Sequence, residues 1–219
     1  VAQFKMLDPK PEMTQHGTPY FLAWTTTPWT LSSNTALCVG PKIEYVAVQS
    51  FNPSTGEPAT YVCAKALLNA HFNPKAADIA FEDYKPGDKL VPFKVVAEYK
   101  GTDLVGMKYE QLLPWITPEN ADQAFRVIPG DYVTTEDGTG IVHIAPTFGA
   151  DDAKVAKAAG IPSLFMINKK GETRPMVDLT GKYYTVDECA EEFVATCVNV
   201  DAYSNHAGDY VKNAYAHEF

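Results

Sequence analysis

Short runs of β-branched and aromatic residues, separated by turn residues, fill the first two thirds of the chain and constrain its fold more than any other feature. Asn52-Pro53 and Thr55-Gly56 separate two of these runs, and a turn at residues 136–138 divides another. This pattern predicts a sheet of short strands joined by tight turns. The predicted strands lie at residues 1–7, 20–26, 35–40, 44–50, 59–64, 89–101 and within 126–146. Pro92 cannot donate a backbone hydrogen bond, so it predicts an edge or a bend in its strand.

Helical patterns are fewer. Residues 64–71 are a short candidate, and residues 149–161 combine an acidic start, an alanine-rich body and Gly160 as a stop signal. Residues 185–200 place apolar side chains at helical spacing. Together the patterns predict an α+β fold, mainly β, with a curved or barrel-like sheet as core and a few peripheral helices. We expect residues 1–219 to form one domain, a fragment of a longer chain.

The composition indicates a folded domain with a limited role in binding nucleic acid. Of the 219 residues, 46% are hydrophobic and 21% are charged, which is enough apolar material for a core. A net charge of −9 argues against a general nucleic-acid binder, because such proteins bind phosphates through cations. It does not exclude a domain that receives one end of a nucleic acid. No apolar run approaches the roughly 18 residues of a membrane helix, so we expect no contact with a membrane.

The four cysteines are Cys38, Cys63, Cys189 and Cys197. They contain no C-x-x-C pair, so the sequence predicts no metal site. Cys189 and Cys197 are eight residues apart, on roughly one face of the predicted helix, and are expected to be small core residues. We expect buried free thiols rather than disulfides, as is typical of a cytoplasmic protein.

Three consecutive threonines, Thr25, Thr26 and Thr27, precede Pro28 and Trp29. Threonine favours a strand, whereas proline cannot donate to a sheet and keeps the residue before it extended. The strand should therefore end near Thr26 or Thr27, with hydroxyl groups at its mouth. The alternative is an ordinary strand end whose hydroxyls form only local hydrogen bonds.

The second notable segment is "DGTGIVHIAPTFGADDAKVAKAAG", residues 137–160. Gly138 and Gly140 permit a tight turn or a close backbone approach. His143 lies on the strand that follows, and Asp151 and Asp152 lie in the first turn of the predicted helix, where the helix dipole favours a carboxylate. Capping by the aspartates and a buried histidine at the rim are the structural alternatives.

These two segments offer hydroxyls, an imidazole and a carboxylate, without a nucleophile paired to a base. Such a set suits the binding of an amine and the positioning of a water molecule.

Three stretches resemble the editing domain of isoleucyl-tRNA synthetases, which is inserted in the catalytic domain of these enzymes. Residues 24–37, "WTTTPWTLSSNTAL", resemble the signature TTTPWTLPxN, with Ser32 at the position of its second proline. Residues 138–152, "GTGIVHIAPTFGADD", resemble GTGxVHxAPxxGxDD, and "KGTDLVGMKYEQLLPW" resembles the segment between them. Valyl- and leucyl-tRNA synthetases carry TTRPET or TTRPDT at the first signature and fit less well.

The resemblance implies roles for single residues. Thr26, Thr27 and Asp152 would be catalytic: the threonines would line the pocket and bind the terminal adenosine or the water, and Asp152 would bind the α-ammonium group of the substrate. The residues implied to bind substrate are Thr25, Trp29, Asn34, His143, Asp151 and Asp152, with Asn34 as a possible brace of its loop.

The role of His143 is open between two alternatives. It is either a steric wall that keeps isoleucine out or the general base for the attacking water.

The implied activity is post-transfer editing, the hydrolysis of valyl-tRNA(Ile) by an oriented water with exclusion of isoleucine. The alternatives are a threonyl ester as substrate and a non-catalytic module that binds an RNA acceptor end. The implied partners are the acceptor end of tRNA(Ile) carrying valine and the rest of the synthetase, and the isolated domain is expected to be a monomer. The ATP-site motifs HIGH and KMSKS are absent, so no cofactor is expected; ATP, Mg²⁺ and any Zn²⁺ would belong to other domains.

Overall fold

The computed structural model describes residues 1–211 and divides into two compact units. Unit 1 comprises Val1–Thr25, Leu37–Glu110 and Arg126–Val142, and unit 2 comprises Thr26–Ala36, Gln111–Phe125 and His143–Phe219. The chain thus passes between the units several times. The prediction that residues 1–219 act as one domain is not decided by this division and stays a prediction.

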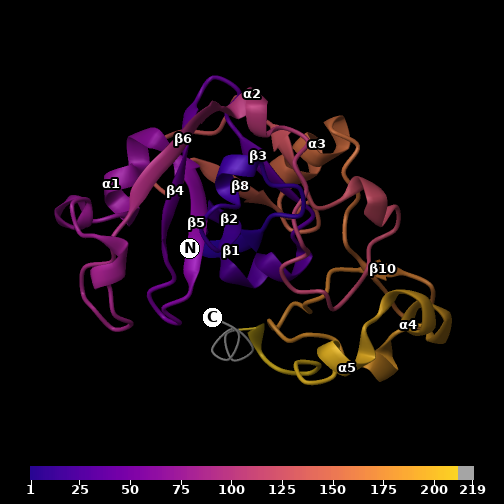
Figure 1. The fold of residues 1–219 in the computed structure, drawn as a ribbon. Coiled ribbons are helices and arrows are strands. Elements are labelled where there is room, and N and C mark those ends of the chain that lie inside the picture. The colour runs from indigo at the N-terminus through magenta and orange to yellow at the C-terminus, as the bar shows by residue number, and fades with distance from the viewer. Residues whose placement is uncertain (212–219) are drawn as a thin grey trace. The chain divides into compact units, whose positions relative to one another are not determined.

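Unit 1 is built on a five-stranded sheet with the strand order β1-β2-β5-β4-β6 (Figure 1). The pair β2 and β5 is parallel, and the other neighbours are antiparallel. The strands are β1 (Ala2–Lys5), β2 (Thr18–Ala23), β4 (Glu44–Phe51), β5 (Pro58–Ala64) and β6 (Lys94–Lys100). Two short helices, α1 (Leu68–His71) and α2 (Gly101–Leu104), belong to the same unit.

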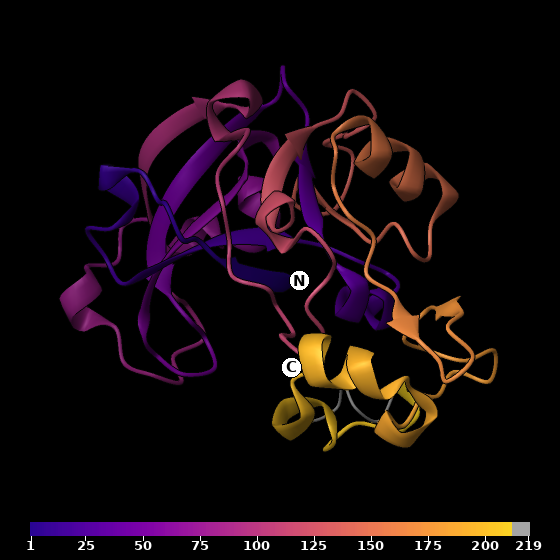
Figure 2. The ribbon, with the colours of Figure 1, turned by 90° about the vertical axis from the view of Figure 1, so that its right-hand side faces the viewer.

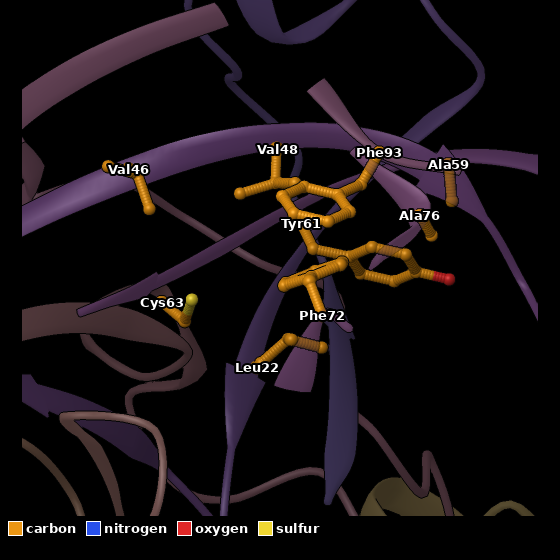
Figure 3. Packing of buried hydrophobic residues seen from close by; sticks show 9 residues of the cluster. All are labelled: Leu22, Val46, Val48, Ala59, Tyr61, Cys63, Phe72, Ala76 and Phe93. Carbon is orange, nitrogen blue, oxygen red and sulfur yellow. The ribbon is translucent and has the colours of Figure 1, made fainter. Parts of the chain in front are cut away.

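Alternation along β4 and β5 creates the core of this unit. Val46 lies opposite Cys63 and Val48 lies opposite Tyr61, so these four side chains share one face of the sheet. Figure 3 shows them packed together with further buried residues. That cluster consists of Leu22, Val46, Val48, Ala59, Tyr61, Cys63, Phe72, Ala76 and Phe93.

The α+β, mainly β fold class predicted from the sequence is confirmed, but the sheets are not closed into a barrel. β1 and β6 form the two edges of the large sheet. The register between β4 and β6 shifts at Ala47/Val48, a β-bulge that increases the local twist. The strand predicted for residues 89–101 begins only at Lys94, beyond Pro92, whose carbonyl accepts a hydrogen bond of 2.8 Å from the Ser50 hydroxyl.

A second, three-stranded sheet has the order β7-β3-β8 and consists of β3 (Ala36–Val39), β7 (Arg126–Pro129) and β8 (Ile141–Ile144). The buried Tyr45 hydroxyl fixes the turn before β8, because it accepts from the Gly40 amide at 2.9 Å and donates to the Gly140 carbonyl at 2.6 Å. Gly140 has φ = 72°, and a Cβ at this position would lie 2.4 Å from the Ala64 Cβ. Gly140 therefore has the close approach that was one of the two alternatives predicted for the GTG motif, together with a positive φ that favours glycine.

Unit 2 consists of short elements (Figure 2). Its helices are α3 (Ala150–Ala158), α4 (Glu191–Cys197) and α5 (Val200–Tyr203), and its hairpin pairs β9 (Met166–Ile167) with β10 (Thr173–Arg174). Trp115 packs edge-on against Tyr183 and stacks on His206 in its interior. The helix predicted for residues 149–161 is confirmed as α3.

Several 3₁₀-helices complete the chain. The turn predicted as a helix at residues 64–71 begins as one of them and continues as α1. The 3₁₀-helices are η1 (Pro11–Met13), η2 (Pro28–Ser33), η3 (Lys65–Leu67), η4 (Pro74–Ala76), η5 (Phe81–Asp83), η6 (Ala121–Gln123) and η7 (Val186–Glu188).

The helix predicted for residues 185–200 is confirmed only for its central part, α4 (Glu191–Cys197), and a single helix over the whole range is wrong. Glu188 accepts hydrogen bonds from the amide and the hydroxyl of Thr185, which caps the start of a single turn, η7. Cys189 then becomes extended, with ψ = 159°, and pairs with Asn168 beside β9. The local pairing with the hairpin thus overrides the helical spacing of the sequence. All four cysteines are thiols rather than disulfides, as predicted; Cys38, Cys63 and Cys189 are buried, but Cys197 is only half-buried.

We predict that Gly140→Ala destabilises the chain more than Gly106→Ala does. Both glycines have positive φ, which costs an alanine about 1–2 kcal/mol, but nothing lies within 4 Å of a Cβ at Gly106. Overpacking against Ala64 should add about 1–3 kcal/mol at Gly140. Urea unfolding of both variants measures the difference, and equal losses would show that the turn before β8 is not crowded.

Candidate functional site

The threonine segment turns earlier than predicted. β2 ends at Ala23 rather than near Thr26 or Thr27, and η2 begins directly at Pro28. Proline suits the first position of a helical turn, because its φ is already helical and its missing amide hydrogen is not needed there. The amide and the hydroxyl of Thr30 both donate to the Thr27 carbonyl, at 3.0 and 2.8 Å. Thr30 is therefore folded back over Thr27.

Thr30 also contacts His143, which lies on β8 and is 8% exposed. The distance between Thr30 Oγ1 and His143 Nε2 is 3.1 Å. Because the Thr30 hydroxyl hydrogen is already donated to Thr27, the imidazole has to donate through Nε2–H. This assigns the tautomer in which Nδ1 carries the lone pair.

The Nδ1 atom of His143 is buried and has no hydrogen-bond partner within the described part of the chain. Burial without a partner disfavours the charged imidazolium and lowers the pKa of His143 to about 4. The side chain is therefore neutral at pH 7. One nitrogen is held by Thr30 and the other is enclosed, so the histidine is fixed as a rigid ring.

Asp152 lies in the first turn of α3 but does not cap it. The N-cap residue is Gly149, without a side-chain cap. The Asp152 carboxylate instead accepts a hydrogen bond of 2.9 Å from the Ala145 amide, two residues after His143. This bond holds the carboxylate at the end of β8. Burial raises the pKa of Asp152; the Ala145 amide opposes this shift, and the charge of Asp151 adds to it.

The buried side chain of Asn34 links the threonine segment to β8, which belongs to the second motif. It is 3% exposed, and its amide nitrogen donates to the Ala36 carbonyl at 2.9 Å and approaches the Ile144 carbonyl at 3.5 Å. The Thr35 amide donates to the Ile144 carbonyl as well, at 3.0 Å. These hydrogen bonds brace the chain beside His143, and the binding of substrate by Asn34 stays a prediction.

The remaining candidate residues differ in their exposure to solvent. Thr27 and Thr30 are half-buried, while Thr26 and Asp151 are exposed. Trp29 is 46% exposed. All of these belong to unit 2, as do His143, Asp152 and Asn34, whereas Thr25 belongs to unit 1.

Thr30 was missed by the sequence-based reasoning. The signal was present, because Pro28 at the start of a helical turn places the residue two positions later back over Thr27.

Across residues 1–211, no group of three or more histidine, cysteine, aspartate or glutamate side chains could hold a metal ion. No helix in this part of the chain is long and apolar enough to cross a membrane. The groups brought together are hydroxyls, a neutral imidazole and a carboxylate, and the oriented group that could bind a cation is Asp152.

Known relatives of this chain are isoleucine--tRNA ligases. The chain is 74% identical over 224 residues to the enzyme of Bacteroides thetaiotaomicron and 59% identical over 216 residues to that of Porphyromonas gingivalis. Each match covers 98% of this chain and 19% of the relative. The chain belongs, as a fragment, to the isoleucine--tRNA ligase family. It spans about a fifth of the length of the curated relatives it matches. No family model matches it.

The fold is that of a synthetase editing domain. The crystal structure of GlLeuRS-CP1, from a leucyl-tRNA synthetase, aligns with a TM-score of 0.54 at 15% identity and covers 99% of this chain and 91% of that one. The editing domain of the cytosolic leucyl-tRNA synthetase of P. knowlesi aligns with a TM-score of 0.52 at 14% identity, over 75% of this chain and 69% of that one. At such low identity the likeness concerns the fold alone.

We predict that the buried, neutral His143 makes this fragment of the isoleucine--tRNA ligase family less stable in mild acid. The unfolded chain binds a proton at His143 below a pKa of 6.5, whereas the folded chain does so only near pH 4. The free energy of unfolding should therefore fall by roughly 3 kcal/mol between pH 6.5 and 4 through this residue. The His143→Gln variant should not show this loss of stability when it and the wild type are unfolded in urea across that pH range. Parallel curves for the two proteins would contradict it.

Proposed function

We propose that the chain hydrolyses the ester bond of valyl-tRNA(Ile) and rejects isoleucine. The observation that carries the proposal is the pairing, in unit 2, of a carboxylate fixed at the end of β8 with a neutral histidine held by Thr30. The match to isoleucine--tRNA ligases and the editing-domain fold support it. Valine and isoleucine differ by one methylene, which changes the free energy of binding by only about 1–3 kcal/mol. Charging of the tRNA with the smaller valine is therefore the error that such a site has to correct.

Asp152 binds the α-ammonium group of the aminoacyl ester. One of its oxygens accepts from Ala145, and no second hydrogen bond to the carboxylate comes from residues 1–211. The other oxygen is therefore left for a charge-assisted hydrogen bond to the substrate. Because Ala145 fixes the carboxylate, the ammonium group and the ester carbonyl beside it are fixed in turn.

The chemical step needs only an oriented water. An aminoacyl ester is already activated, so water attacks the carbonyl carbon, the bond from that carbon to the ribose oxygen breaks, and the proton from water ends on the ribose. Thr26 and Thr27 carry hydroxyls next to the start of η2, and these hydroxyls would hold the water or the terminal adenosine. Orientation of this kind supplies catalysis without a covalent intermediate.

His143 acts as the wall of the side-chain pocket rather than as the base. A base needs an accessible lone pair, but Nε2–H donates to Thr30 and Nδ1 is enclosed. A pKa of about 4 also makes the imidazole a weak base at neutral pH. A ring fixed in this way resists displacement, so the extra methyl of isoleucine meets a steric barrier.

The rest of the proposal concerns partners and cofactors. The ligand is the acceptor end of tRNA(Ile), and the remaining contacts to the tRNA come from other parts of the synthetase. Hydrolysis by this chain needs neither a metal nor ATP, and the isolated chain is a monomer that binds whole tRNA weakly because of its charge of −9.

We predict that Asp152→Asn abolishes most of the deacylation of valyl-tRNA(Ile) and leaves the fold intact. The asparagine oxygen still accepts from Ala145, but the attraction to the ammonium group is lost, a loss of about 1.5–3 kcal/mol or roughly 10- to 150-fold in rate. Asp201→Asn, an exposed change in α5, is the matched control and should retain full activity. Normal hydrolysis by Asp152→Asn would exclude the proposed role.

We predict that His143→Ala lets the chain hydrolyse isoleucyl-tRNA(Ile) and still hydrolyse valyl-tRNA(Ile). Removing a wall opens space, whereas removing a general base would slow both reactions by about 10²–10⁴-fold. Deacylation rates of both esters decide between the roles. Slow hydrolysis of both esters would exclude the role of His143 as a steric wall.

A further inference from the structure

A hollow of about 310 Å³ lies in unit 1, beside the core face of the large sheet. Gln3, Leu22 and Tyr61 line it from three neighbouring strands, β1, β2 and β5. Phe51 and Phe72 add aromatic side chains to the lining. Figure 3 shows Leu22, Tyr61 and Phe72 as members of the core cluster, so the hollow continues the core. Its volume is that of a site for a small molecule, which is about 300–1,000 Å³ in proteins.

The hydroxyl of Tyr61 is a polar group that the fold does not use. Tyr61 is 4% exposed, and its hydroxyl oxygen is buried without a hydrogen-bond partner among residues 1–211. Burial raises the pKa of Tyr61 to about 12, so the phenol keeps its hydrogen at neutral pH. Since buried polar groups in folded proteins nearly always have a partner, an enclosed donor in the lining of a hollow indicates an acceptor from outside the chain.

The other polar groups of the lining favour an anion. Among the described residues, no carboxylate lines the hollow, whereas Lys89 does. None of the salt bridges within residues 1–211 involves Lys89. The side-chain oxygen of Asn73 accepts from the Lys75 amide at 3.1 Å, so its NH₂ group is left to donate. His71 already donates through Nε2–H to the Gly138 carbonyl at 2.7 Å.

We propose that this hollow binds a small aromatic carboxylate. Its ring packs against Leu22, Phe51 and Phe72, because aromatic rings form favourable offset and edge-to-face contacts with one another. Its carboxylate accepts hydrogen bonds from the donors of the lining, and such bonds are stronger when the acceptor is charged. The proposal is independent of the proposed function, since no residue of the candidate site lines the hollow.

The test is an NMR titration of the backbone amide signals, with phenylacetate as the probe and phenylacetamide as a neutral probe of the same shape. The signals of Leu22, Tyr61 and Phe72 should shift saturably with phenylacetate. The dissociation constant of phenylacetamide should be larger by about 1.5- to 5-fold, which is the effect of an exposed ion pair with Lys89.

Two variants separate the donors. Lys89→Met should remove the difference between the two probes, because it keeps a long side chain without its charge. Tyr61→Phe should weaken binding of phenylacetate by about 10- to 150-fold, because a hydrogen bond from an enclosed donor to a charged group is lost. It should not lower the urea concentration at which the chain unfolds, because the hydroxyl has no partner in the fold. Lys94→Met is the matched control, a change at an exposed lysine of β6 outside the hollow.

The absence of saturable shifts in the wild type would overturn the proposal, as would unchanged binding of phenylacetate by both Lys89→Met and Tyr61→Phe. Equal binding of the two probes by the wild type would exclude a carboxylate as the ligand. An equal loss in Lys94→Met would show attraction by the charge of the whole chain instead of a site. Easier unfolding of Tyr61→Phe in urea would show that the hydroxyl serves the fold.

Discussion

The hydroxyl of Thr30 is the interaction on which the arrangement of the candidate site depends. It donates to Thr27 and accepts from His143, so one group closes the turn after Pro28 and also orients the imidazole of β8. Since a hydroxyl has a single hydrogen, the first bond determines the direction of the second. The tautomer of His143 follows from this assignment, whereas burial encloses Nδ1 and lowers the pKa of the imidazole.

A second constraint places the carboxylate. The Ala145 amide can bind Asp152 because β8 ends at Ile144, and α3 begins six residues later, at Ala150. The short turn between β8 and α3 reverses the direction of the chain and leaves the Phe148 side chain exposed to solvent. The same turn therefore fixes the carboxylate that is proposed to bind the amine, and it presents an aromatic side chain to solvent. Burial raises the pKa of the Asp152 carboxyl group, while the Ala145 amide holds the carboxylate in place. A carboxylate in such a site is better suited to binding a cation than to binding water.

Much of the fold follows from the sequence pattern, and its failures have physical causes. The helix at residues 149–161 was predictable because its acidic start, alanine-rich body and glycine stop are local signals. The break at Cys189 was not, since it depends on pairing with Asn168 on a distant hairpin. An open rather than closed sheet likewise depends on which strands meet at the edges. In the site, the two motifs identified His143 and Asp152, but the hydrogen bond between Thr30 and His143 joins residues 113 positions apart and no single motif contains it.

The central claim is that a fixed carboxylate and a fixed neutral ring make this site a hydrolase for the smaller amino acid. It is tested most directly by the wild-type chain acting on one tRNA(Ile) preparation charged in turn with valine, threonine or isoleucine. The account predicts fastest hydrolysis of the valyl ester and no hydrolysis of the isoleucyl ester above the uncatalysed rate. Hydrolysis of the threonyl ester should be slower, because its hydroxyl would lose its water against a ring whose Nε2–H is bound to Thr30 and whose Nδ1 is enclosed. A threonyl ester that is hydrolysed faster than the valyl ester, or a chain that binds the charged ends and hydrolyses none, would contradict it.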